Sequence, residues 1–180
     1  MIIQTKNSRQ VLLRKLTLDD IDQLSDYFQQ LGAATVKRYG PHGFDKQSIS
    51  ALYQNPHEYS GYIALDIETS EVVAYSIIKR GYLEHDGYRL QSYGLTLDVK
   101  TDCTFAPSVA DLWQSQGIGN SLFHFMVLDL KDKGIKRILL WGGVQSDNQK
   151  ALNYYRKNGF ITLGQFEYNG LNEDMILEIE

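Results

Sequence analysis

Apolar residues recur every three or four positions in four segments of the chain, which is the spacing of an amphipathic helix. The first predicted helix follows a capping-box pattern at Thr17–Asp20 and continues to about Leu31. A second, short helix follows Asp45, whose side chain is suited to cap it. The other two predicted helices cover residues 119–133 and 148–157.

Other segments alternate between apolar and polar residues, or are continuously apolar, as β-strands are. The predicted strands cover residues 11–16, 62–67, 72–78, 104–109, 137–144, 160–166 and 175–179. The second and third of these form a hairpin, and the last two are joined through the Asn169–Gly170 turn. Pro107 lacks a backbone donor, so the strand that contains it should be unpaired or bulged there.

The pattern is least regular over residues 81–103, where glycines alternate with tyrosines. Part of this segment is expected to form an extra strand or an extended loop. Elsewhere helices and strands follow one another without repeats, low-complexity tracts or linkers. The sequence therefore predicts a single mixed α/β domain over residues 1–180.

The composition, with 43% hydrophobic and 22% charged residues, is that of a globular chain with a full core. The formal net charge of −4 argues against general nucleic-acid or anionic-membrane binding, because both require a basic face. Residues 1–6 lack the apolar stretch of a signal peptide, and no apolar run is long enough to cross a membrane. The single cysteine, Cys103, suits a reducing compartment, and we expect it to be buried in a strand of a cytoplasmic protein.

Two glycines, Gly117 and Gly119, stand one residue apart where a loop leads into the third predicted helix. Such a junction lets a ligand approach the backbone, and the helix end offers it N–H donors and a positive dipole. This arrangement is typical of phosphate binding. A dinucleotide-binding fingerprint needs a small residue where Leu122 stands, and an ATP-binding loop needs Gly-Lys-Ser/Thr, so neither fits.

Two groups of residues extend this motif. The first group is Val109, Trp113, Gln114, Gly117 and Gly119, and the second is Asn148, Ala151, Tyr155, Gly159 and Phe160. Their order and spacing resemble the two signature blocks of the GNAT N-acetyltransferase superfamily, whose acetyl-CoA loop reads Arg/Gln-x-x-Gly-x-Gly/Ala. The resemblance covers most of the chain and leaves residues 32–60 and 81–103 as variable segments.

The resemblance implies an α/β (α+β) fold with a mixed, mostly antiparallel sheet of six to seven strands, about four helices, and splayed strands at the acetyl-CoA site. Backbone N–H groups from Gln116 to Asn120 would hold the pyrophosphate. The pantetheine arm would pair with the splayed strands, and an N–H near Val109 would polarise the thioester carbonyl. The acetyl-CoA site predicted in this way comprises Val109, Gln114, Ser115, Gln116, Gly117, Ile118, Gly119, Asn120, Asn148 and Tyr155.

Tyr155 is the predicted general acid. When an amine attacks the thioester, its phenol can donate a hydrogen bond to the departing CoA thiolate. A phenol with a pKa of about 10 transfers its proton to a thiol with a pKa of about 8.5 only late in the step. The alternative is that Tyr155 packs in the core beside Leu152. Asn148 likewise either binds the pantetheine or caps its helix.

The residue that accepts the proton of the amine is not evident from the sequence. An alkyl amine is almost fully protonated at neutral pH, so some group must take its proton. Many family members use a glutamate on the strand before the loop, but residues 104–108 contain no carboxylate. The candidates for a base, besides a chain of water molecules, are His42, Glu84, His85 and Asp98, whereas His124 is expected to be structural.

Other residues near the two blocks have simpler interpretations. Lys150, Arg156 and Lys157 either meet the 3′-phosphate of CoA or form a solvated helix face. Trp113 is expected to pack beneath the loop, and Trp141 is expected in the core. No metal site is predicted.

The leading hypothesis is an N-acetyltransferase that moves an acetyl group from acetyl-CoA to a primary amine of a small molecule or a protein. Direct attack within a ternary complex is expected, because no activated cysteine or serine is evident. The alternative is a non-catalytic sensor or interaction module that binds acyl-CoA without turnover. Residues 32–60 and 81–103 are expected to shape the acceptor pocket, and the sequence leaves the acceptor and a possible homodimer open.

Overall fold

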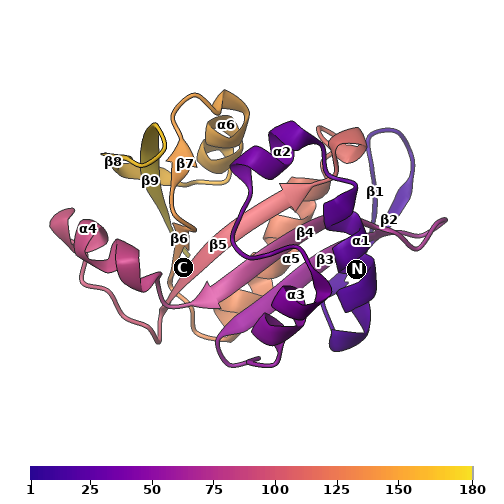
Figure 1. The fold of residues 1–180 in the computed structure, drawn as a ribbon, viewed down its shortest axis with the longest axis horizontal. Coiled ribbons are helices and arrows are strands. Elements are labelled where there is room, and N and C mark those ends of the chain that lie inside the picture. Colours follow the sequence, from indigo (N-terminus) through magenta and orange to yellow (C-terminus); the bar gives the residue numbers. More distant parts are fainter. Residues whose placement is uncertain (180) are drawn as a thin grey trace. The chain divides into compact units, whose positions relative to one another are not determined.

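The computed structural model describes residues 1–179, which divide into two compact units. The first unit contains residues 1–78 and 106–126, and the second contains residues 79–105 and those from 127 onward. Three elements of the chain contribute residues to both units: strand β4 (Val72–Arg80), strand β5 (Asp102–Val109) and helix α5 (Ile118–Asp132). Figure 1 shows the order of the elements along the chain.

The first unit is built on the N-terminal strands and three helices. Besides its parts of β4, β5 and α5, its elements are β1 (Ile2–Gln4), β2 (Gln10–Lys15), α1 (Ile21–Gln29), α2 (Ala33–Arg38), α3 (Lys46–Tyr53) and β3 (Tyr59–Asp66). The strands are hydrogen-bonded in the order β1-β2-β3-β4-β5. The predicted hairpin of β3 and β4 is confirmed, and β1, which pairs antiparallel with β2, was not predicted.

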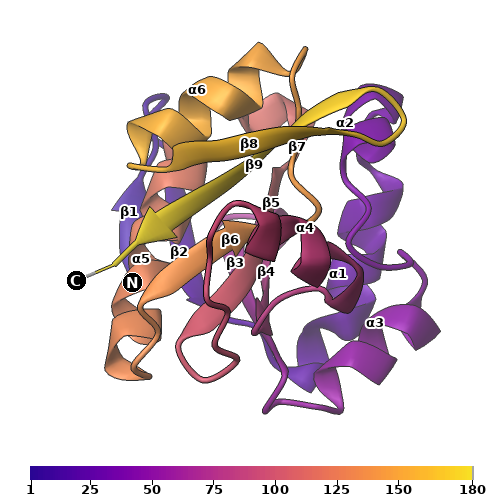
Figure 2. The same cartoon turned by 90° about the vertical axis from the view of Figure 1, so that its left-hand side faces the viewer.

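Helices cover both faces of this part of the sheet. Figure 2 shows β3 and β4 between α1 and α3 on one face and α5 on the other. The burial is therefore continuous over residues 72–78 of β4, and Tyr62 and Tyr75 are both fully buried. Tyr62 meets Phe125 of α5 edge to face, with ring centroids 6.3 Å apart. Strands covered on both faces lose the alternation of apolar and polar residues, as observed here.

The predicted helix starts are confirmed by their hydrogen bonds. The buried carboxylate of Asp20 accepts the backbone N–H of Thr17 at 2.8 Å and both terminal nitrogens of Arg14 at 2.6 Å. Asp45 caps α3 by accepting the backbone N–H of Ser48 at 2.9 Å. A side-chain acceptor at this position satisfies a donor that the helix itself cannot.

The second unit contains a short 3₁₀ turn at Glu84–Asp86 and the C-terminal elements. These are α4 (Gly87–Ser92), β6 (Arg137–Leu140), β7 (Val144–Gln145), α6 (Gln149–Lys157), β8 (Ile161–Glu167) and β9 (Leu171–Glu178). Strand β5 pairs parallel with β6, and β6, β7 and β8 each pair antiparallel with β9. Within residues 1–179 the chain thus has nine strands, mostly antiparallel, and six α-helices, more than the predicted six to seven strands and about four helices.

The single strand predicted over residues 137–144 is wrong. It is divided into β6 and β7 by a turn in which Gly142 and Gly143 both have positive φ, at 66° and 73°. Trp141 begins this turn and is only partly buried, so its predicted place in the core is also wrong. The apolar residues of this segment predict one continuous strand, and only the two glycines indicate that the chain turns there.

Residues 81–103 form no extra strand before β5. Helix α4 instead packs through Leu90 against Leu139 and Ile176, and Leu95 and Leu97 cover the same cluster. Arg89 of α4 donates to Asp174 of β9 at 2.6 Å and lies 3.6 Å above the ring of Phe166. The segment is therefore held to the β8–β9 hairpin by a buried ion pair and apolar contacts.

This packing gives a test of the second unit. A Cβ added at Gly164 of β8 would lie 2.3 Å from the ring of Tyr93, whose hydroxyl donates to Asp174 at 3.1 Å. We expect Gly164→Ala to lower the free energy of unfolding by about 1–3 kcal/mol, because the ring must move. Chemical denaturation measures this loss. Gly40→Ala is the control, since nothing lies within 4 Å of its Cβ; equal effects of the two changes would contradict the packing.

Candidate functional site

The loop between β5 and α5 turns twice through left-handed backbone. Ser115 has a φ of 63° and Gly117 a φ of 93°. Helix α5 begins at Ile118, and the N–H of Ser121 donates to the carbonyl of Gly117 at 3.1 Å. Nothing lies within 4 Å of a Cβ built on Gly117, so the outer side of this turn is open. The first turn of a helix presents N–H groups along its axis, which is the geometry that binds phosphate.

The start of the loop is fixed to the neighbouring strands. The N–H of Ala110 donates to the carbonyl of Val73 in β4 at 2.9 Å. The side chain of Gln114 donates from Nε2 to the carbonyl of Val109 at 3.1 Å. Two residues of the predicted acetyl-CoA site, Val109 and Gln114, are thus in direct contact.

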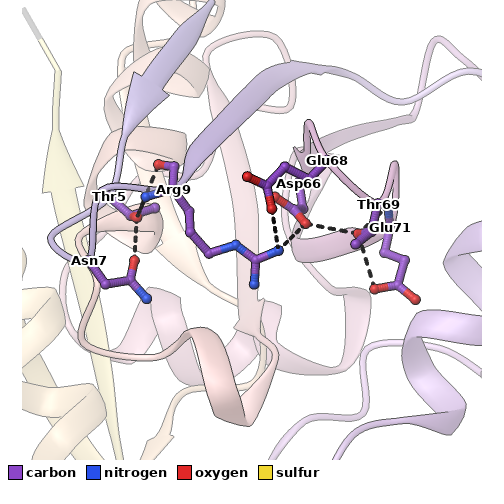
Figure 3. A network of polar contacts seen from close by, with 7 residues as sticks. All are labelled: Thr5, Asn7, Arg9, Asp66, Glu68, Thr69 and Glu71. Carbon is purple, nitrogen blue, oxygen red and sulfur yellow. Dashed lines mark hydrogen bonds and ion pairs between the residues drawn. The ribbon is translucent and has the colours of Figure 1, made fainter.

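The turn between β1 and β2 supports the loop from the other side. The guanidinium of Arg9 lies 4.3 Å from the ring centroid of Trp113, and the N–H of Lys6 donates to the carbonyl of Gln116 at 3.3 Å. Figure 3 shows Arg9 directed at the fully buried carboxylate of Asp66, which also accepts the hydroxyl of Thr69 at 2.9 Å. Trp113 therefore packs against the protein, as expected, on a cation that Asp66 holds in place.

The second signature block lies in the second unit. Asn148 is the N-cap of α6, and its Oδ1 accepts the N–H of Ala151 at 3.2 Å. Tyr155 is 8% exposed and meets the ring of Phe160 at 5.4 Å and that of Phe105 at 6.4 Å. Burial raises the pKa of Tyr155 well above its ordinary value. Its phenol therefore stays protonated and acts as a hydrogen-bond donor at any working pH.

The pairing of the two parallel strands ends just before the loop. The last register pair is Phe105 with Leu140, and the N–H of Trp141 donates to the carbonyl of Phe105 at 3.0 Å. Strand β6 stops at Leu140, whereas β5 continues through Pro107 to Val109. Pro107, which cannot donate to a ladder, thus falls in the part of β5 beyond this pairing, in agreement with the prediction.

Of the candidate bases, His42 is held by hydrogen bonds at both nitrogens of its ring. Its Nδ1 lies 2.7 Å from the carbonyl of Gly43, so Nδ1 carries the proton and Nε2 accepts from the hydroxyl of Tyr75 at 3.1 Å. Tyr75 in turn is hydrogen-bonded to the hydroxyl of Tyr53. Burial lowers the pKa of His42, and the ring is therefore neutral at pH 7.

The environments of the other candidate bases differ. Asp98 closes a turn by accepting the N–H of Lys100 at 2.9 Å and the hydroxyl of Thr101 at 3.2 Å, and these bonds lower its pKa. His85 is exposed and lies 3.6 Å from Asp86. His124 lies on the exposed face of α5. Asp98 therefore has a structural task, and His85 and His124 face solvent.

The three cations of α6 are not equivalent. Arg156 donates to Glu173 of β9 at 3.2 Å and is thereby tied to the sheet. Lys150 and Lys157 are exposed. The lysines remain the candidates for the 3′-phosphate, and Arg156 is better explained as a support for β9.

The part of the chain that the structure describes contains no reactive cysteine and no cluster of metal ligands. Cys103 is fully buried in β5, and burial raises the pKa of its thiol, so it is not a nucleophile. Among residues 1–179, no cluster of three or more histidine, cysteine or carboxylate side chains is placed to hold a metal ion. The described helices are too short or too polar to cross a membrane.

Sequence reasoning missed several residues that shape this region. Arg9, Asp66, Tyr53, Tyr75 and Asp111 carry no motif, and their partners lie far from them along the chain. The only local signal was the polar character of Asp111, two residues before Trp113 at the family's aromatic position. Such contacts depend on tertiary structure and leave no periodic trace.

Comparisons with known proteins agree with this geometry. Residues 24–160 match the family model described as "Acetyltransferase (GNAT) family". No curated protein is significantly similar in sequence. Among solved structures, the GNAT domain of S. lividans PAT has a TM-score of 0.74 at 17% identity and covers 99% of this chain and 96% of its own.

Two further solved structures contain the ligand class that the sequence predicts. YncA from Salmonella typhimurium, described as a putative acetyltransferase with its cofactor acetyl-CoA, has a TM-score of 0.70 at 15% identity and covers 94% of each chain. The PaiA N-acetyltransferase from Thermoplasma acidophilum, in complex with coenzyme A, has a TM-score of 0.68 at 15% identity and covers 94% of this chain and 99% of its own. These likenesses show a shared fold, and the family match spans most of the sequence. The chain belongs to the GNAT acetyltransferase family.

Proposed function

We propose that the protein is an acetyl-CoA-dependent N-acetyltransferase that acts on a primary amine of a small molecule or a protein. The observation that carries this proposal is the open, left-handed turn at Ser115 and Gly117 at the start of α5, in a chain of the GNAT family. Acetyl-CoA would enter as the acyl donor and leave as CoA. Release of CoA from acetyl-CoA across a panel of amines is the direct test.

The loop would bind the nucleotide half of the donor. Backbone N–H groups from Gln116 to Asn120 would face the pyrophosphate, where the dipole of α5 favours negative charge. The N–H of Val109 would polarise the thioester carbonyl, beyond the point at which β5 stops pairing with β6. Because Asn148 uses its Oδ1 to cap α6, its contact with the pantetheine would come from Nδ2.

In the reaction, the amine nitrogen attacks the thioester carbonyl carbon, a C–N bond forms and the C–S bond breaks. The sulfur leaves as a thiolate and needs a donor. Tyr155 supplies this donor, and its raised pKa makes complete proton transfer to sulfur uphill. Its role is therefore a hydrogen bond that strengthens as charge develops on sulfur, with protonation following late.

The proton of the amine would pass to Nε2 of His42, directly or through one water molecule, once the hydroxyl of Tyr75, which donates to this nitrogen at rest, donates to Tyr53 instead. His42 contacts Tyr75 of β4, whose carbonyl accepts the hydroxyl of Ser108, the residue before Val109, at 3.4 Å. The neutral imidazole, in the segment between α2 and α3, thus lies in the same unit as Val109 and contacts β4, the strand that pairs with β5. It would replace the carboxylate that β5 lacks.

A second function remains as the alternative, namely a sensor or interaction module that binds acyl-CoA without turnover. The absence of a carboxylate from residues 104–108 favours it, and the intact cap and tyrosine of α6 favour catalysis. Acetyl-CoA binding with no CoA release from any amine would select the sensor. Cytoplasmic location and a homodimer remain predictions.

Donor binding is tested by substitution at the turn. We expect acetyl-CoA to raise the melting temperature of the protein by several degrees, since a saturating ligand adds about 3 kcal/mol at 100 times its Kd. Gly117→Leu should abolish this shift, because its side chain would fill the open side of the turn. Gly94→Leu is the matched control, with a φ of 83° and nothing within 4 Å of its Cβ. A shift that survives in Gly117→Leu would contradict the site.

Tyr155 is tested against its neighbour. Tyr155→Phe removes the donor to the thiolate and should lower kcat by about 100-fold, with the Kd of acetyl-CoA little changed. Steady-state CoA release measures the rate, and calorimetry measures the Kd. Tyr154→Phe, at the preceding position of α6, is the control and should keep most of kcat. Unchanged turnover in Tyr155→Phe would remove this residue from the mechanism.

His42 is tested by the pH dependence of kcat/KM. Because its pKa is lowered, the wild-type rate should fall only as pH drops below the ordinary histidine value of about 6.5, when the ring becomes protonated. His42→Gln should lower kcat/KM at pH 7 by about 100-fold and replace the plateau above pH 6.5 by a rate that rises with pH toward the pKa of the amine, because only the neutral amine then reacts. His85→Gln is the exposed control and should leave the profile unchanged. A pH profile of His42→Gln that matches the wild type, with the plateau above pH 6.5 retained, would exclude His42 as the base.

A further inference from the structure

Helix α2 is a short element with unusually little support of its own. It has six residues, and none of them is buried. A helix of this length is unstable in isolation, because nucleation costs more than a few hydrogen bonds return. Its position therefore depends on contacts at its ends. It lies within residues 32–60, the segment expected to shape the acceptor pocket.

The N-terminal end of α2 is held by a residue from the loop before α5. The carboxylate of Asp111 accepts the backbone N–H of Gly32 at 2.7 Å and the hydroxyl of Thr35 at 2.7 Å. Gly32 is the N-cap position and has no side chain to cap the helix itself. Asp111 thus provides from a distance the acceptor for the N-cap N–H that an acidic third residue of the helix provides in a capping box, a position that Thr35 holds here.

The fit at this contact is tight. A Cβ on Gly32 would lie 2.9 Å from Oδ2 of Asp111, so a larger residue would displace the carboxylate. The same carboxylate accepts Nε2 of Gln114 at 3.3 Å, and Gln114 also donates to the carbonyl of Val109. One side chain therefore connects α2 with the residues that lead into the phosphate-binding turn.

The charge of Asp111 determines whether docking of α2 favours or opposes binding of the acyl donor. A carboxylate beside a loop that binds a polyanion repels it, unless hydrogen-bond donors and a helix dipole engage the charge. Donors at the start of α2 engage it when α2 is docked. Docked α2 should therefore favour binding of the acyl donor, and by reciprocity the bound donor should favour docked α2.

We propose that Asp111 is a positioning residue that couples acetyl-CoA binding at the loop to the docking of α2 on the acceptor side of the site. This inference rests on the proposed function. It means that the acceptor pocket is completed when the donor is bound, so the acceptor binds more tightly to the loaded enzyme. Asp111 itself need not touch either substrate.

Hydrogen–deuterium exchange of the full chain, with and without acetyl-CoA, tests the coupling without an acceptor. In the wild type, acetyl-CoA should slow exchange in peptides covering residues 32–38 by about tenfold, as well as in peptides covering residues 114–121. Thr35→Val removes one of the two bonds that the start of α2 donates to Asp111 and should reduce the effect on α2 to a few-fold. The protection at residues 114–121 should remain.

Ser48→Ala is the matched control. Ser48 holds the same position in α3 as Thr35 holds in α2, and its hydroxyl donates to the capping Asp45 at 2.6 Å. It should leave the response of α2 to acetyl-CoA unchanged. Asp111→Asn keeps the shape of the side chain and removes its charge, so Thr35→Val should have no further effect on the Kd of acetyl-CoA in that background.

The outcomes separate this inference from the proposed function. Protection of residues 114–121 with no change in residues 32–38 would overturn the coupling and leave donor binding intact. Full protection of α2 in Thr35→Val would overturn it as well. Protection of neither segment by acetyl-CoA would overturn the proposed function and the coupling together.

Discussion

The two left-handed positions at Ser115 and Gly117 are the constraint on which the site depends. They turn the chain from β5 so that the loop leads directly into the N-terminal end of α5. A non-glycine residue in this conformation costs roughly 1–2 kcal/mol, so Ser115 keeps it only because its surroundings hold it. The loop needs no metal and no charged side chain to attract a phosphate, since the backbone itself provides the donors.

The rest of the first unit can be understood as the support of this turn. Val73 fixes its start, Arg9 and Asp66 hold Trp113 beneath it, and Asp111 connects it with α2. In the second unit, the phenol of Tyr155 is surrounded by the aromatic rings of Phe105 and Phe160. Burial suits this phenol to hydrogen-bond a thiolate and makes it a poor acid on its own.

Features with local signatures could be predicted from the sequence. The helices after Thr17 and Asp45, the β3–β4 hairpin and the two signature blocks all depend on spacing or on turn residues close in the chain. The extra elements could not be predicted for identifiable reasons. Strand β1 has only three residues, α2 buries no side chain and so has no apolar period, and Gly142–Gly143 interrupts what reads as one strand.

The candidate site divides in the same way. Gly117 and Tyr155 were found because they belong to motifs, whereas Asp111 and His42 act through partners far along the chain. Arg89 is paired with Asp174, 85 residues away, and no sequence pattern near either residue predicts this contact. Sequence therefore predicted the donor site and named His42 among several candidate bases, and the structure was needed to show which side chains support the predicted loop and what surrounds His42.

In the proposed function, the backbone turn before α5 binds the pyrophosphate of the acyl donor. Calorimetric titration with acetyl-CoA and with S-acetylpantetheine, which carries the same thioester without the pyrophosphate, tests it most directly. Loss of two or more charge-assisted hydrogen bonds should weaken binding of S-acetylpantetheine by at least about 100-fold. Affinities within about threefold of each other would contradict the account, because the turn would then contribute nothing to donor binding.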